Sequence, residues 1–180
     1  MIDEMLEFNR AFVEGNGHEP YVTSKYPDKK VAIITCMDTR LVELLPAALG
    51  IRNGDVKMIK NAGGVVTEPF GSAVRSVLVG IYELGIEEVM VIGHTDCGAQ
   101  RISGEAMVRL MLDRGIPMSA VDECRYFDVD FDRWLSGFDT VESSVKRSVE
   151  MLRRHPLIPE DVSVRGFIID SLTGEIRSVS

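Results

Sequence analysis

The chain has 180 residues and a formal net charge of −8, and 45% of its side chains are apolar while 27% are charged. This length and balance predict one globular domain over residues 1–180 and argue against disorder. The acidic charge and the lack of a basic stripe argue against a nucleic-acid partner. No apolar run approaches the roughly 20 residues that cross a bilayer, so no membrane partner is expected.

Met1 is followed by Ile2-Asp3-Glu4 rather than by a basic region and an apolar stretch, so no signal peptide is expected. Three cysteines are too few for a disulfide scaffold. Together these features predict a cytoplasmic protein in a reducing compartment.

Apolar residues recur at helical spacing over residues 2–15, which predicts an N-terminal helix followed by a loop over residues 19–30. The run from Val31 to Thr35 is continuously apolar and β-branched, as in a strand buried on both faces of a parallel sheet. A short helix is expected over residues 41–49 and a second strand over residues 56–60.

The second half of the chain repeats this alternation. Helices are expected over residues 69–84, 103–114 and 140–154, and strands over residues 88–92, 162–169 and 175–179, whereas residues 115–137 look less regular. The order predicts an α/β fold with a central, mostly parallel four-stranded sheet flanked by helices and a possible antiparallel edge strand.

Two cysteines and a histidine follow the ends of predicted strands. Cys36 comes directly after the first strand, while His94 and Cys97 follow the third. Because ligands bind at the carboxyl ends of strands in open α/β sheets, we expect these three side chains to meet. Their ligand atoms suit Zn²⁺, and three ligands leave a fourth position open, as in catalytic zinc sites. Two alternatives are a pair of buried reduced thiols and a redox pair, although no C-x-x-C motif supports the second.

Asp38 and Arg40 alternate with Cys36 along an extended segment, so their side chains are expected on one side of it. An arginine beside Asp38 would keep this carboxylate ionised near the metal, where it could accept a hydrogen bond from a bound water. Asp38 could equally form a surface ion pair or cap the helix that begins near Leu41.

The pattern Cys36-x-Asp38-x-Arg40 followed by His94-x-x-Cys97 resembles the zinc signature of the β-class carbonic anhydrases. Asn61-Ala62-Gly63-Gly64, residues 72–85 and residues 155–159 also resemble segments of the short prokaryotic members. The likeness extends over about residues 28–180.

The resemblance implies one Zn²⁺ per chain bound by Cys36, His94 and Cys97. It also implies that Asp38 and Arg40 form a dyad that orients the zinc-bound hydroxide or switches the site on and off. The implied reaction is the reversible hydration of CO₂ to bicarbonate and a proton. The implied assembly is a homodimer or larger homo-oligomer in which residues 1–27 pack on a partner subunit. Val65 and Val66 could line an apolar CO₂ pocket.

Two other functions remain open for the same fold. One is hydrolysis of a CO₂ analogue such as carbon disulfide or carbonyl sulfide, which the zinc motif does not exclude. The other is a non-catalytic zinc- or bicarbonate-binding protein, against which the Asp38–Arg40 pair argues because a structural zinc would not need it.

Several further residues receive simpler interpretations. Asp96 is interpreted as a turn residue, and Cys124, in a segment over residues 101–138 that matches the family poorly, as a spectator thiol. His18 and His155 are candidate proton shuttles. His155 is more simply interpreted as a cation that caps the last turn of its helix.

Overall fold

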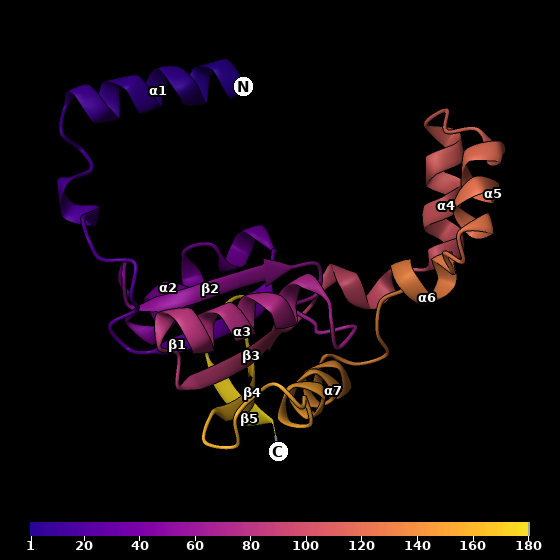
Figure 1. Cartoon of the computed structure of the whole chain (residues 1–180). Helices are drawn as coiled ribbons and strands as arrows, with labels where there is room; N and C mark the ends of the chain where they lie inside the picture. The colour runs from indigo at the N-terminus through magenta and orange to yellow at the C-terminus, as the bar shows by residue number, and fades with distance from the viewer. Residues whose placement is uncertain (180) are drawn as a thin grey trace.

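A computed structural model describes residues 1–179 and contains a five-stranded sheet with the order β2-β1-β3-β4-β5 (Figure 1). The strands are β1 (Val31–Cys36), β2 (Val56–Asn61), β3 (Glu88–His94), β4 (Ser163–Ile169) and β5 (Ile176–Val179). The first four are parallel, and β5 pairs with β4 in the antiparallel sense. The predicted four-stranded parallel sheet with an antiparallel edge strand is confirmed.

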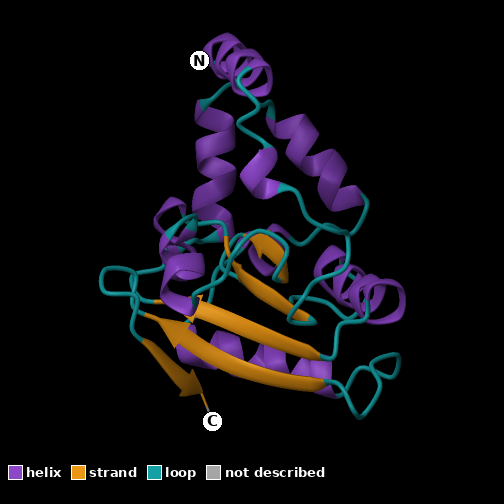
Figure 2. Ribbon diagram, turned by 90° about the vertical axis from the view of Figure 1, so that its left-hand side faces the viewer, coloured by secondary structure: helices purple, strands orange, loops and turns teal. Residues whose placement is uncertain are grey.

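Helices cover both faces of this sheet (Figure 2). Ile33 and Ile34 of β1 point to opposite faces because successive side chains of a strand alternate. Ile34 packs in a core with the helices α3 (Ser72–Leu84) and α7 (Val141–Arg153), and Ile33 packs in a second core with α2 (Leu44–Leu49). Burial on both faces explains why β1 has no polar alternation in the sequence.

Helix α3 begins three residues later than predicted. Gly71 is its extended N-cap, and the carbonyl of Pro69 accepts a hydrogen bond from the His155 ring at 2.9 Å. The proline therefore belongs to the preceding turn and does not occupy the first helical position.

Residues 115–137 are more regular than predicted, because they contain α5 (Met118–Tyr126) and α6 (Phe131–Leu135). Val121 and Phe131 of these helices pack on Val108 of α4 (Gly104–Asp113) in a small core of their own. Figure 1 shows these helices projecting from the sheet, so their apolar residues do not follow the pattern of a sheet-covering helix.

Helix α1 (Ile2–Glu14) forms as predicted, and a short 3₁₀ turn (Glu19–Tyr21) follows it. Figure 1 shows α1 standing apart from the sheet, and none of its residues is buried. Its exposed apolar side chains are Ile2, Met5, Leu6, Phe8 and Val13. The described chain therefore leaves the apolar side of α1 uncovered.

Among residues 1–179, no helix combines the length and the apolar character that crossing a membrane requires.

Candidate metal centre

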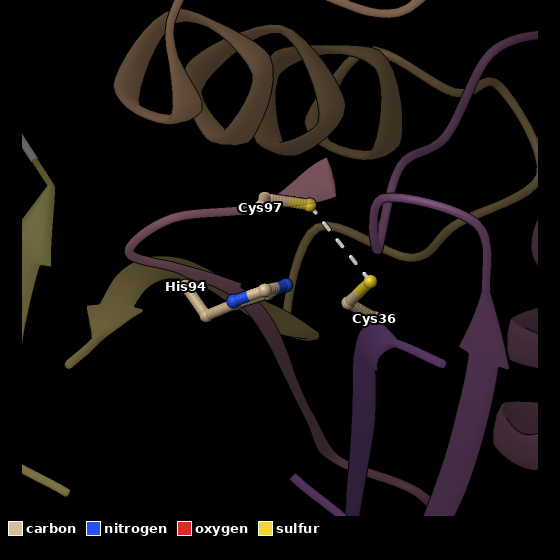
Figure 3. Close-up of side chains that lie close together, drawn as sticks. All are labelled: Cys36, His94 and Cys97. Atoms are coloured by element: carbon tan, nitrogen blue, oxygen red, sulfur yellow. Dashed lines mark hydrogen bonds between the residues drawn. The ribbon is translucent and has the colours of Figure 1, made fainter. Parts of the chain in front are cut away.

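Neighbouring parallel strands bring Cys36, His94 and Cys97 together, as the sequence predicted. Cys36 ends β1 and His94 ends β3, while Cys97 begins the 3₁₀ turn that follows (Gly98–Arg101). One ligand atom from each lies within 4.8 Å of the others, and the two sulfur atoms are 3.9 Å apart (Figure 3). All three residues are buried.

The His94 ring is oriented as a metal ligand. Its Nδ1 lies 2.8 Å from the carbonyl oxygen of Thr95, which can only accept, so Nδ1 carries the proton and Nε2 has a free lone pair. Nε2 is the only buried side-chain nitrogen or oxygen in residues 1–179 without a hydrogen-bond partner. Such an atom calls for an explanation. With two sulfur ligands beside it, the group fits Zn²⁺ and leaves a fourth position open.

The two sulfur atoms sit in different electrostatic surroundings. Burial raises the pKa of the Cys36 thiol. The His94 ring, whose free Nε2 can take up the thiol proton, and the backbone of Asp38 and Gly63 outweigh burial and bring this pKa down to about 7. Burial and the neighbouring Cys36 sulfur raise the pKa of Cys97 to about 11. Cys36 is therefore the sulfur that the protein itself prepares as a thiolate, the form that binds metals.

Asp38 and Arg40 form a bidentate pair beside this group. Arg40 Nε donates to Asp38 Oδ1 at 3.0 Å, and Arg40 Nη2 donates to Oδ2 at 2.8 Å. These bonds hold the pKa of Asp38 well below its ordinary value. Oδ2 also lies 3.8 Å from His94 Nε2, so the ionised carboxylate borders the place where a metal would sit.

The same carboxylate also caps the 3₁₀ turn Thr39–Leu41, since Asp38 Oδ1 accepts from the backbone N–H of Arg40 at 2.9 Å. The predicted ion pair is therefore present. The capped element is this 3₁₀ turn, whereas the helix expected to begin near Leu41 begins at Leu44. The side chain and the backbone N–H of Arg40 thus both hold the Asp38 carboxylate.

Asp96 does more than form a turn. It has the left-handed φ of 51° expected of a turn residue. However, its Oδ2 lies 3.2 Å from Arg40 Nη1, and its carbonyl accepts from Arg40 Nη2 at 2.9 Å. The sequence analysis missed this link because the two residues are 56 positions apart.

Ser171 is a second residue that the sequence analysis missed. Its hydroxyl donates at 3.1 Å to the carbonyl of Thr95, the same oxygen that binds the His94 ring. Its backbone N–H donates to Thr95 Oγ1 at 2.9 Å. The turn after β4 thereby braces the carbonyl that orients His94.

His155 is not the helix-capping cation that we expected. It is buried, its Nδ1 accepts from the N–H of Leu157 at 3.2 Å, and its Nε2 donates to the carbonyl of Pro69. His155 therefore links two loops through its two ring nitrogens. Cys124 is exposed and free, apart from the metal-binding group.

Comparison with known proteins agrees with this geometry. The family model described as carbonic anhydrase matches residues 31–176. The chain is 54% identical over 176 residues to "Putative carbonic anhydrase YtiB" of Bacillus subtilis, covering 98% of this chain and 94% of that protein. It is 32% identical over 162 residues to a carbon disulfide hydrolase of Acidithiobacillus thiooxidans, covering 83% of this chain and 77% of the other.

The fold matches the crystal structure of β-carbonic anhydrase isoform I from Trichomonas vaginalis with a TM-score of 0.89 and 34% identity, over 99% of this chain and 97% of that one. The chain belongs to the β-carbonic anhydrase family.

Proposed function

We propose that the protein catalyses the reversible hydration of CO₂ to bicarbonate and a proton, with one Zn²⁺ per chain held by Cys36, His94 and Cys97. The observation that carries this proposal is the position of Asp38. An ionised carboxylate, paired with Arg40 at 2.8 Å, stands 3.8 Å from the free Nε2 of His94. A zinc site that served structure alone would not need this pair.

Bound zinc supplies the Lewis acidity that makes water a nucleophile near neutral pH. Asp38 would accept a hydrogen bond from a water held at that site and so orient it. Arg40 keeps Asp38 ionised and fixes the direction in which its carboxylate faces. The half-buried Val65 and the buried Val66 are proposed as the apolar wall against which CO₂ rests.

We further propose that the working form is a homodimer or a larger homo-oligomer. The support is α1, whose apolar side chains have no partner within the described chain. Residues 1–27 would cover this surface by packing on a neighbouring subunit.

A second candidate function is hydrolysis of carbon disulfide or carbonyl sulfide. The similarity to a carbon disulfide hydrolase favours it. These substrates are also small and apolar, and attack on their carbon would use the same metal and the same Asp38.

The deciding experiment is stopped-flow CO₂ hydration from about pH 6.5 to about pH 9 on protein of known zinc content. We expect a rate that requires zinc and rises with pH. The same samples receive carbon disulfide and carbonyl sulfide, with hydrogen sulfide release as the measure. Zinc-loaded protein that hydrates CO₂ no faster than buffer, but releases hydrogen sulfide, would replace the first function with the second. If neither reaction occurred, a binding protein would be left.

A further inference from the structure

We infer that Asn61 is a positioning residue that holds the Cys36 sulfur in place for a metal ion, through the glycine turn that follows β2. The inference rests on the proposed function only in taking Cys36 as a metal ligand. It assigns a task to a residue that no step of the proposed reaction uses.

Asn61 links Met37, the residue after Cys36, to the turn that follows β2. The two residues are register partners in the parallel pair β1–β2. The carbonyl of Asn61 accepts from the N–H of Met37 at 2.9 Å and from the N–H of Gly64 at 3.3 Å. Its side chain forms two more bonds, since Oδ1 accepts from the N–H of Val65 at 2.9 Å and Nδ2 donates to the carbonyl of Val65 at 2.7 Å.

These bonds close a tight turn against β1. Gly63 and Gly64 have left-handed φ values of 85° and 64°. A Cβ atom on Gly64 would lie 2.7 Å from the backbone nitrogen of Cys36, so the turn is in direct backbone contact with β1. The turn can come this close only because it carries no side chain there.

The turn lies against the end of the strand that carries the sulfur. A Cβ atom on Gly64 would meet the backbone of both Thr35 and Cys36, the last two residues of β1. The backbone carbonyl of Asn61 binds Met37, the residue after Cys36, and the Asn61 side chain binds Val65, the residue after Gly64. The side chain of Asn61 therefore fixes the turn that packs against the residue carrying the metal-binding sulfur.

The amide group is specific to this task. The amide offers one donor and one acceptor to the two backbone groups of Val65, whereas a carboxylate offers acceptors alone. Asn61→Asp keeps the shape of the side chain but loses the bond to the Val65 carbonyl and places a negative charge against it. Asn61→Ala loses both bonds. Partners of this kind around metal ligands change metal affinity by about 10- to 100-fold when mutated.

The test compares Asn61→Asp and Asn61→Ala with a matched control, Asn53→Ala. Asn53 is an exposed asparagine whose Nδ2 also donates to a backbone carbonyl, that of Tyr21 at 2.6 Å. Affinities for Zn²⁺ and Co²⁺ are measured on the full chain by competition with a chromogenic chelator. The thiolate-to-cobalt charge-transfer band reports the sulfur environment, and circular dichroism of each loaded protein reports the fold.

We expect both Asn61 variants to bind Co²⁺ about 10- to 100-fold more weakly, with a shifted charge-transfer band, while Asn53→Ala matches the parent. If Asn61→Asp bound Co²⁺ with the affinity and the spectrum of the parent, the inference would be overturned. If Asn61→Ala does not fold, the result for Asn61→Asp alone tests the inference. If the parent hydrates CO₂ but the Asn61 variants bind metal normally, only this inference fails. If the parent binds metal but hydrates nothing, only the proposed function fails. A parent that binds no metal overturns both.

Discussion

At the scale of single residues, Asp38 is the side chain on which the proposed chemistry depends most. Its carboxylate is fixed by the fork of Arg40 and by the backbone N–H of Arg40. It therefore faces the metal-binding group in one orientation, as an acceptor only. Asp38 is therefore expected to contribute to the reaction through its negative charge and through the orientation that it gives to an attacking water.

We predict that Asp38→Asn lowers the CO₂ hydration rate by about 100-fold or more while zinc content stays unchanged, because the amide keeps the shape but removes the charged acceptor. Since Arg40 holds the pKa of Asp38 well below its ordinary value, the carboxylate stays ionised over the whole assay range. The ratio of parent to variant rates should thus be constant with pH. Asp96→Asn is the control, since Asp96 also pairs with Arg40 but is 70% exposed. Similar losses in both variants would contradict the assignment.

At the scale of elements, the turn after β2 packs directly against the backbone of β1. We predict that Gly64→Ala destabilises the protein by more than the roughly 1 kcal/mol that a left-handed φ costs an alanine. The extra loss comes from the Cβ contact at 2.7 Å with the backbone of Cys36.

Urea unfolding of the zinc-loaded proteins measures the difference. Gly50→Ala is the matched control because Gly50 has a φ of 62° and nothing within 4 Å of its would-be Cβ. Equal losses at the two positions would show that φ alone matters and that the close approach to β1 does not.

At the scale of the whole molecule, α1 is the surface through which we propose that copies of the chain meet. We predict that light scattering at micromolar concentration finds a dimer or larger assembly. Replacing the exposed Met5 and Leu6 with glutamate should shift it toward monomers, because charges would then be buried in the apolar contact. Arg10→Glu, on the polar side of the helix, should leave the assembly intact. A monodisperse monomer of the parent protein would contradict the prediction.

The sheet and the metal-binding group could be predicted from the sequence because both follow from local pattern. An apolar β-branched run marks a buried strand such as β1, and parallel strands place their ends at one edge. That rule alone brings Cys36 and His94 together, although it says nothing of their distance.

The rest depends on contacts that no local pattern records. The helices α5 and α6 bury Val121 and Phe131 against α4 rather than against the sheet. Each of these short helices therefore carries too few regularly spaced apolar residues to predict a helix. Asp96 and Ser171 act on partners that are 56 and 76 positions away. His155 was misread because its position at a helix end is also compatible with burial between two loops.

The hydrogen bonds between Ser171 and Thr95 have a consequence for engineering. The tip of a hairpin is ordinarily where a chain tolerates insertions. Here the second residue of the turn between β4 and β5, Ser171, braces the carbonyl behind His94. A peptide tag inserted directly after Ile169 would loosen that brace. A tag between Leu172 and Thr173 would part Thr173 from Asp170 Oδ1, which accepts from the backbone N–H groups of both residues. The whole turn is therefore a poor site for a fusion, although it joins the last two strands of the sheet.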